Sequence, residues 1–259
     1  MGAASKQVVQ KQNMNQVISE MTQRLEFLQE CGDYRVIFQR VYLLMTKEMQ
    51  RRLIDDFFED SVWMERVLVK FAQYYFDAID SYEIGKYCSP AWKLAFDQAT
   101  DRRGFVVQDA LLGINAHINS DLPMVLHSIL TEDKAWPDAR IMMRRRQDHE
   151  RINEVLADLV DLAQDELANH HARFIRPVDF LMGRKDESLS SFILTHCRSS
   201  VWYNTELLLD APDEEQWNFH KKRIENDAYT IALRVTQYNS RRFTLLKRFA
   251  SFARRYRWF

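Results

Sequence analysis

Glycine and proline are scarce in this chain, with six glycines and five prolines in 259 residues. Strand-rich folds need many tight turns, which these two residues supply, so their scarcity favours long helices. Apolar residues also recur at helical spacing, as in Val67, Leu68, Phe71 and Tyr75. We find no convincing segment with the alternating pattern of a half-buried strand. The sequence therefore predicts an all-α fold.

Helix-breaking and helix-capping residues divide the chain into about eight helices within one domain, residues 1–259. A short helix should start with Ser89 as N-cap and Pro90 in the first position. The segment after "DAPDEEQW" should break near Asn239 before a basic C-terminal helix at 240–259. The other helices are expected at about 5–31 (the N-terminal helix, 1–30), 34–57, 61–82, 105–131, 136–172 and 189–209. The helix at about 105–131 should be the buried centre of the bundle.

The balance of charges excludes some classes of protein. There are 36 Lys and Arg and 37 Asp and Glu residues, so the overall charge gives no nucleic-acid signal. Three widely spaced cysteines, Cys31, Cys88 and Cys197, argue against a disulfide framework and predict a reducing, cytoplasmic location. No apolar run approaches the roughly 20 residues that span a bilayer, so we expect no transmembrane segment.

The C-terminal stretch "SRRFTLLKRFASFARRYRWF" interleaves arginines with apolar residues. Such a basic amphipathic helix can contact acidic lipid, RNA or a protein partner. More often its apolar face docks on its own domain and the arginines stay in water. We therefore expect docking, with weak contact to a membrane surface as the alternative.

The stretch "LLGINAHINSDLPMVLHSIL" looks like protein interior but contains several polar groups. Between Gly104 and Leu130 the only charged residues are Asp109 and Asp121, so this helix should be buried on all sides. At about 100° per residue its polar residues form two edges. We call them the amide edge (Gln108, Asn115 and Asn119) and the His–Asp edge (His117 and Asp121).

The His–Asp edge can present a nitrogen and a carboxylate to one metal ion, because His117 and Asp121 are one helical turn apart. Small residues beside the pair should leave space there, namely Ala110, Gly113 and Ser120. His127 would approach the same ion if Pro123 kinks the helix. Alternatively, the pair only satisfies its own hydrogen bonds within the core.

Other polar residues could complete a site. Asp77 lies on an otherwise apolar helix, as an inward carboxylate or as a surface acid. Asp148 could be a further metal ligand, but it lies in the charged stretch "RRRQDHERINEVL", which favours a solvated face instead. An inward Arg198 would need an anion, either a protein carboxylate or a substrate phosphate. The remaining candidates for substrate binding are Asn115, Asn119, Asn153, Trp202 and Asn204.

Several stretches in order resemble a helical family known only as a domain of unknown function, number 5995. They are "FQRVYLLMTKEM", "FAQYYFDAIDSY", "SPAWKLAF", "LLGINAHINSDLP", "DHERINEVL" and "SSVWYNTELLL". The resemblance covers about residues 35–210 and implies a fold and a site but no reaction. Its pattern falls on Asp77, Asn115, His117, Asn119, Asp121, Asp148, Asn153, Trp202 and Asn204.

A shorter stretch, "HINSDLPMVLH", is similar to the H-x-x-x-D…P-x-H stretch of the all-helical zinc-dependent phospholipase C and single-strand nuclease fold. That likeness implies a zinc-binding role for His117, Asp121 and His127. Pro123 departs from the pattern, and this chain has no equivalent of the N-terminal tryptophan ligand typical of that fold.

Three functions follow as hypotheses. The first is a hydrolase-like enzyme that uses a divalent metal, zinc or magnesium, on a small phosphate- or diphosphate-bearing substrate. Its catalytic residues would be His117, Asp121 and Asp77. The second is a terpene-cyclase-like lyase that removes diphosphate with Mg²⁺, loosely echoed by "NDAYTIALR" and "RRY" but lacking a D-D-x-x-D motif. The third is a non-catalytic helical binding protein.

Overall fold

The structure is a computed structural model that describes residues 13–102, 106–170 and 200–255, with backbone alone at 107, 157–170 and 238–255. Every regular element in these ranges is helical, so the predicted all-α class is confirmed. The labelled elements are α1 (Met14–Glu30), α2 (Val36–Ile54), α3 (Ser61–Glu83), α4 (Pro90–Thr100), α5 (Val106–Asn115), η1 (Ala116–Asp121), α6 (Leu122–Glu132), α7 (Ala139–His170) and α10 (Glu214–Arg255). Residues 200–209 form a further helix.

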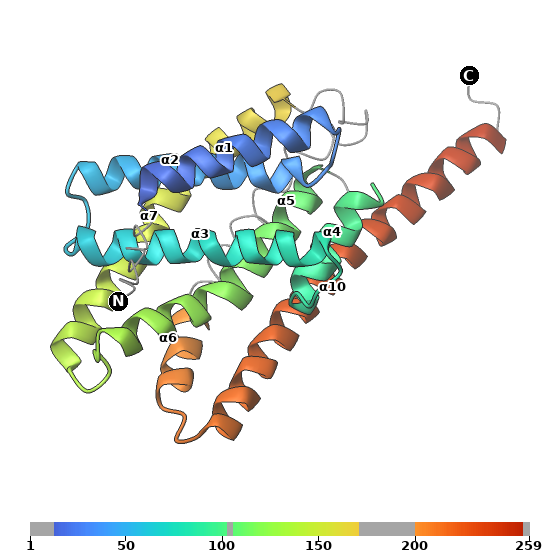
Figure 1. The fold of residues 1–259 in the computed structure, drawn as a ribbon. Helices are drawn as coiled ribbons and strands as arrows, with labels where there is room; N and C mark the ends of the chain where they lie inside the picture. Colours follow the sequence, from blue (N-terminus) through green and yellow to red (C-terminus); the bar gives the residue numbers. More distant parts are fainter. Residues whose placement is uncertain (1–12, 103–105, 171–199, 256–259) are drawn as a thin grey trace, which may run out of the picture.

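The segments α5, η1 and α6 follow one another without a break and form the central helix (Figure 1). Two apolar clusters enclose it. The first joins α5 to α1, α2, α4, α10 and the second half of α3, and the second joins α6 to α7 and the first half of α3. Ile118 of η1 contacts both clusters, so the His–Asp edge lies where the two clusters meet.

The amide edge of the central helix packs on α10. Gln108 donates a hydrogen bond to the carbonyl of Val235 at 3.0 Å, and Asn115 donates to the carbonyl of Ala228 at 2.9 Å. The donors ascend in sequence while the acceptors descend, so the two helices are antiparallel. Ala228 and Ala232 are fully buried, and their small side chains let the backbones come close.

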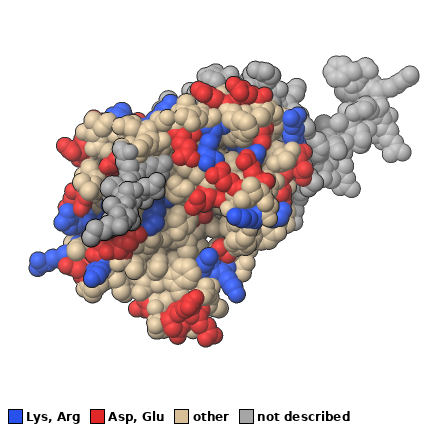
Figure 2. All heavy atoms as spheres, in the orientation of Figure 1, with Lys and Arg blue, Asp and Glu red and all other residues tan. Residues whose placement is uncertain are grey.

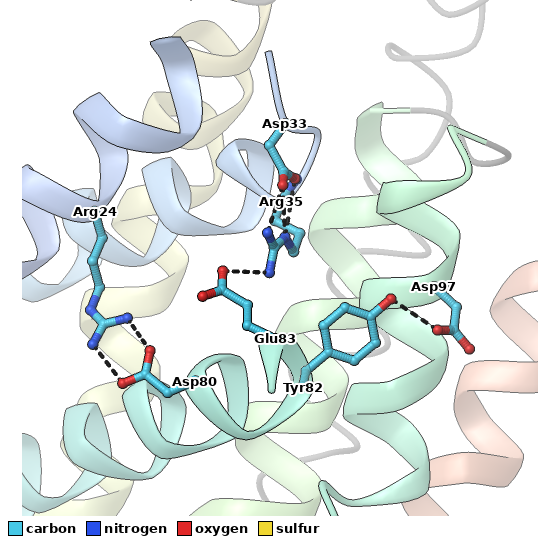
Figure 3. Close-up of polar contacts among 7 residues, drawn as sticks. All are labelled: Arg24, Asp33, Arg35, Asp80, Tyr82, Glu83 and Asp97. Atoms are coloured by element: carbon cyan, nitrogen blue, oxygen red, sulfur yellow. Dashed lines mark hydrogen bonds and ion pairs between the residues drawn. The ribbon is translucent and has the colours of Figure 1, made fainter. Parts of the chain in front are cut away.

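The C-terminal end of α3 is fastened to three neighbouring elements. Figure 3 shows the contacts, which are Arg24–Asp80, Arg35–Glu83 and Tyr82–Asp97. The first is bidentate, with distances of 2.6 and 2.9 Å. Because the acids are largely exposed, each pair contributes at most about 1 kcal/mol. Their main effect is to fix the position of α3, which forms one wall of the site.

The prediction of a helix break near Asn239 is wrong, because α10 continues from Glu214 to Arg255. Asn and Ser cost a helix only a few tenths of a kcal/mol each, and neither glycine nor proline is there to end it. Figure 1 shows the C-terminal part of α10 extending past the other helices. The predicted docking of its apolar face on the domain involves side chains that lie outside the described set.

Ser89 precedes α4 as predicted, but its side chain makes no capping hydrogen bond. Parts of the predicted first and seventh helices, at 1–12 and 171–199, lie outside the described residues, as does Cys197. Within the described ranges, no helix is both long and apolar enough to cross a membrane.

Candidate functional site

The predicted pair lies on a π-helical turn, η1, inside the central helix. The backbone N–H of Leu122 donates to the carbonyl of His117, five residues earlier instead of four. Pro123 follows directly and has no N–H with which to bond the carbonyl four residues before it. The wider π turn accommodates the N–H group that Pro123 lacks. Single π turns inside α-helices are frequent at functional sites.

His117 and Asp121 contact each other, as the spacing predicts. Nδ1 of His117 lies 3.0 Å from Oδ2 of Asp121. The indole Nε1 of Trp92, from α4, donates to the same oxygen at 2.7 Å. All three side chains are buried, with exposures of 3%, 7% and 1% for the residues His117, Asp121 and Trp92. Two helices thus fix the orientation of the carboxyl group.

The ring of His117 lies among aromatic side chains rather than in open space. Phe71 stacks on it with a centroid distance of 3.5 Å and an interplanar angle of 1°, and Tyr42 meets it edge-on at 4.5 Å. Its Nε2 is buried and has no hydrogen-bond partner among the described residues. Burial lowers the pKa of His117, against the opposing effect of Asp121, so the neutral imidazole is favoured.

Asp121, by contrast, faces a cavity of about 500 Å³. The cavity lies between α3, α6 and α10, and the segment that leads into α4 also lines it. Figure 2, in the orientation of Figure 1, shows charged side chains of both signs spread over this side of the molecule. Burial raises the pKa of Asp121, although the hydrogen bonds from His117 and Trp92 act in the opposite direction.

Two more of the predicted metal ligands line this cavity. Asp77 of α3 is exposed at its edge and accepts a hydrogen bond from Gln73 at 2.8 Å. His127 of α6 is half-buried, and burial lowers its pKa. The structure therefore brings Asp77, Asp121 and His127 to one cavity, whereas His117 lies behind Asp121.

Asp148 lies elsewhere and has a structural contact. Its carboxylate is fully buried and accepts the backbone N–H groups of Glu59 and Asp60 at 2.7 and 2.8 Å. These residues form the turn before α3, and Asp60 in turn caps α3. Phe71, which stacks on His117, lies eleven residues after Asp60, or about 17 Å along α3 at 1.5 Å per residue. Asp148 thus holds the start of α3, far from the pair.

The residues predicted to bind substrate are spread over the molecule. Asn115 and Asn119 bond to each other at 2.8 Å as part of the amide edge, so their amides hold the core together. Asn153 is exposed on α7. Trp202 packs in the second apolar cluster and donates to Glu206, and the partly buried Asn204 follows it outside the cavity lining. Arg198 lies outside the described residues.

The space expected beside the pair is only partly there. A Cβ placed on Gly113 would lie 2.9 Å from the Cβ of Phe38 and closer still to its ring, so Phe38 of α2 fills that space. Ser120 does line the cavity. A small residue in sequence can mark either a void or a close neighbour, and only the packing distinguishes them.

The donor set does not assemble a protein-only metal cage. In the part of the chain that the structure describes, no group of three or more His, Cys, Asp or Glu side chains is close enough to hold an ion. A structural or catalytic zinc needs at least three protein ligands. Mg²⁺ needs only one or two carboxylates when a substrate phosphate and water complete its shell.

Several cavity residues were not anticipated from sequence. They are Tyr74, Tyr87, Trp92, Trp217, Lys221 and Glu225. Trp92 and Trp217 occur in "SPAW" and "DAPDEEQW", patterns that indicate helix starts. Nothing in those motifs indicates that both tryptophans reach the same cavity, because they come together only through the packing of α4 and α10 around the central helix.

The fold and the site define an all-α protein with one buried central helix and a cavity beside its π turn. The chain matches the profile of a family of unknown function, DUF5995, over residues 14–238, and it belongs to that family. The match is longer than the resemblance at 35–210 and includes α1. Searches of curated proteins and of solved structures found no match.

Proposed function

We propose that this chain is an enzyme that transforms a small molecule in the cavity, with Asp121 as the residue that transfers a proton. The observation that carries the proposal is the position of Asp121. It is a buried carboxyl group, held by Trp92 and His117, that faces a cavity of about 500 Å³. Cavities of roughly 300–1,000 Å³ suit small organic ligands.

The surroundings of Asp121 give it the properties of an acid–base group. Burial raises the pKa of Asp121 above its ordinary value, which is the direction that suits a carboxyl group that accepts and then releases a proton. Trp92 can donate to the carboxyl in either protonation state. His117 contributes through position, because its Nδ1 contacts Asp121 while its Nε2 lies within the aromatic cluster. In this proposal His117 is a positioning residue.

The test compares the unaltered protein with Asp121→Asn in a screen for product formation by mass spectrometry. The panel contains phosphate monoesters, diphosphates, carboxylic esters and amines. For any substrate found, we expect Asp121→Asn to lower kcat by about 10²–10⁴-fold, the usual contribution of a general acid or base. Glu154→Gln, an exposed change on α7, is the control. Turnover that Asp121→Asn leaves unchanged would contradict the proposal.

A second candidate is the metal-dependent hydrolase on a phosphate- or diphosphate-bearing substrate. The observation that favours it is that Asp77, Asp121 and His127 share one cavity. Asp77 and Asp121 would hold Mg²⁺, and the ion would neutralise phosphate charge at this acidic lining. Calorimetric titration with MgCl₂, with and without pyrophosphate, tests it. Tight Mg²⁺ binding that needs pyrophosphate and is lost in Asp77→Asn is expected, and no binding under either condition contradicts it.

No specific contact favours the lyase alternative. Asn226, the start of its loose motif, is exposed on α10, and the side chains at 254–256 lie outside the described set. The amide edge fits the non-catalytic alternative, because its groups bond within the core. The cavity beside Asp121 does not by itself favour a protein without catalysis.

A further inference from the structure

The described lining of the cavity carries more acidic than basic groups. Asp77, Asp121, Glu132 and Glu225 face it, with Lys221 as the one described cationic residue among them. His127 also lines it, but burial lowers the pKa of its ring and favours the uncharged form. A ligand that enters this cavity therefore meets a negative field, which attracts cations and repels anions.

One of these acids is already neutralised by the protein. Glu132 receives Lys70 at 2.6 Å and Arg66 at 3.2 Å, and both cations are thereby occupied at the rim. They are poorly placed to bind an incoming phosphate, because doing so would break existing ion pairs.

Two other acids accept hydrogen bonds from uncharged donors instead. Asp77 accepts from the amide of Gln73 at 2.8 Å, and Glu225 accepts from the hydroxyl of Tyr87 at 3.0 Å. These bonds orient the carboxylates without cancelling their charge. The two residues come from α3 and α10, on different walls of the cavity, so a cation between them would be attracted from both sides.

Aromatic rings make up the second part of the lining. Tyr74 of α3, Trp217 of α10 and Tyr87, from the segment before α4, line the cavity together with the buried Trp92. Aromatic faces attract ammonium groups through the ring quadrupole, and rings combined with carboxylates are the usual way in which proteins hold substituted ammonium ions.

The protein itself places an ammonium group against one of these rings. Nζ of Lys221 lies 5.7 Å from the centroid of Trp217, within the range of a cation–π contact. This contact is independent of the acidic groups, and it shows that the ring face of Trp217 can accept a positive charge. Lys221 therefore occupies part of the position that a cationic ligand would take.

We propose that the cavity binds an organic cation, an alkylated or primary ammonium group, between the rings of Tyr87 and Trp217 and the carboxylates of Asp77 and Glu225. The proposal rests on the cavity of the proposed function and names the class of its ligand, but it does not require Asp121 to be catalytic. It also assigns Lys221 as an internal competitor for the ligand.

A pair of probes with the same shape isolates the effect of charge. The (2-hydroxyethyl)trimethylammonium ion and 3,3-dimethylbutan-1-ol differ in one central atom, which makes the first cationic and the second neutral. Titration of the full chain is followed by tryptophan fluorescence and by calorimetry. We expect the cation to bind about three- to thirtyfold more tightly, the range for cation–π contacts. Equal affinities, or no binding of either probe, would overturn the proposal.

Substitutions on α10 should change the affinity for the cation in a definite direction. Lys221→Gln should tighten binding of the cation severalfold, because it removes the competing ammonium and one positive charge. Lys222→Gln, on the next residue and exposed, is the matched control and should leave the affinity unchanged. A site that is built for phosphate would show the reverse, with weaker binding of inorganic phosphate in Lys221→Gln and no binding of the cation.

Two further variants test the groups that would hold the ligand. Trp217→Leu and Glu225→Gln should each weaken cation binding severalfold. Phe219→Leu, 58% exposed on the same helix, and the exposed Glu215→Gln are their controls. Losses of the same size in variant and control would overturn the assignment of these two residues.

The failure of this inference is distinguishable from failure of the proposed function. If Asp121→Asn abolishes turnover of a neutral or anionic substrate while the cation does not bind, only the ligand class is wrong. If the cation binds and Asp121→Asn turns over every substrate found as well as the unaltered chain, only the catalytic role is wrong.

Discussion

The two polar edges of the central helix differ in what surrounds them. On the amide edge, Asn115 is fully buried and bonds both to the backbone of α10 and to Asn119. On the His–Asp edge, Asp121 is hydrogen-bonded to Trp92 and His117 but also faces a cavity, and Nε2 of His117 has no partner in the described part of the chain. Both edges lie on the central helix, between Gln108 and Asp121.

The difference separates a structural polar contact from a functional candidate. Buried polar groups that are hydrogen-bonded within the protein stabilise one arrangement of helices. A buried carboxyl with a raised pKa and access to a cavity costs folding free energy, and that cost is typical of functional sites. Mutations on the two edges should therefore change stability in opposite directions.

The largest effect on stability is expected from Asn115→Ala. The change removes the bond to the Ala228 carbonyl, leaves the amide of Asn119 without its acceptor and opens a small void. Together these should lower the free energy of unfolding by about 2–4 kcal/mol. Urea unfolding followed by circular dichroism measures it. Asn226→Ala, an exposed change, should stay within about 0.5 kcal/mol, and an equal loss in both would refute the structural role of the amide edge.

Gly113→Ala should give the next largest effect. The added Cβ overlaps Phe38, which packs against the same face of the helix as the His–Asp edge. Overpacking of this kind costs about 1–3 kcal/mol. Thermal unfolding of Gly113→Ala, Phe38→Leu and the double variant checks the cause. The double variant should recover part of the loss, whereas strictly additive losses would show that Phe38 is not the obstacle.

Asp121→Asn should have the smallest effect on stability and the opposite sign. The folded-state pKa of Asp121 is raised above 3.8, so its stabilising contribution is complete below pH 3.8 and is lost as pH rises through the folded pKa. The amide can still accept from Trp92 and contact His117 without burying a charge. At neutral pH the variant should be at least as stable as the unaltered protein.

Unfolding of both proteins between pH 4 and 8 provides the measurement. The stability of Asp121→Asn relative to the unaltered chain should increase as pH rises. His117 is present in both proteins, but Asp121 opposes the lowering of its pKa, so in Asp121→Asn that pKa is lowered further. A lowered histidine pKa gives a contribution that is present above pH 6.5 and lost as pH falls, and the loss is larger in the variant, which adds to the same trend. A variant that loses stability as pH rises would mean that the carboxylate is stabilised in the folded state.

The sequence was sufficient for the parts that depend on local patterns. Scarce glycine and proline and the 3.6-residue periodicity gave the helical class, and the run without charges from Gly104 to Leu130 identified the buried central helix. Spacing alone placed His117 beside Asp121 and grouped Gln108 with Asn115, since residues on one helix have fixed relative directions. These relations hold whatever the helix packs against.

Only the tertiary structure decided what each edge meets. The sequence could not say that Gly113 faces Phe38, that Asp148 holds the start of α3, or that Trp92 and Trp217 reach one cavity from helices more than 100 residues apart. Each of these contacts joins separate helices, and the relative placement of helices depends on the packing of the whole core. The periodicity of any single helix fixes its faces, but the neighbours of those faces are set by the other helices.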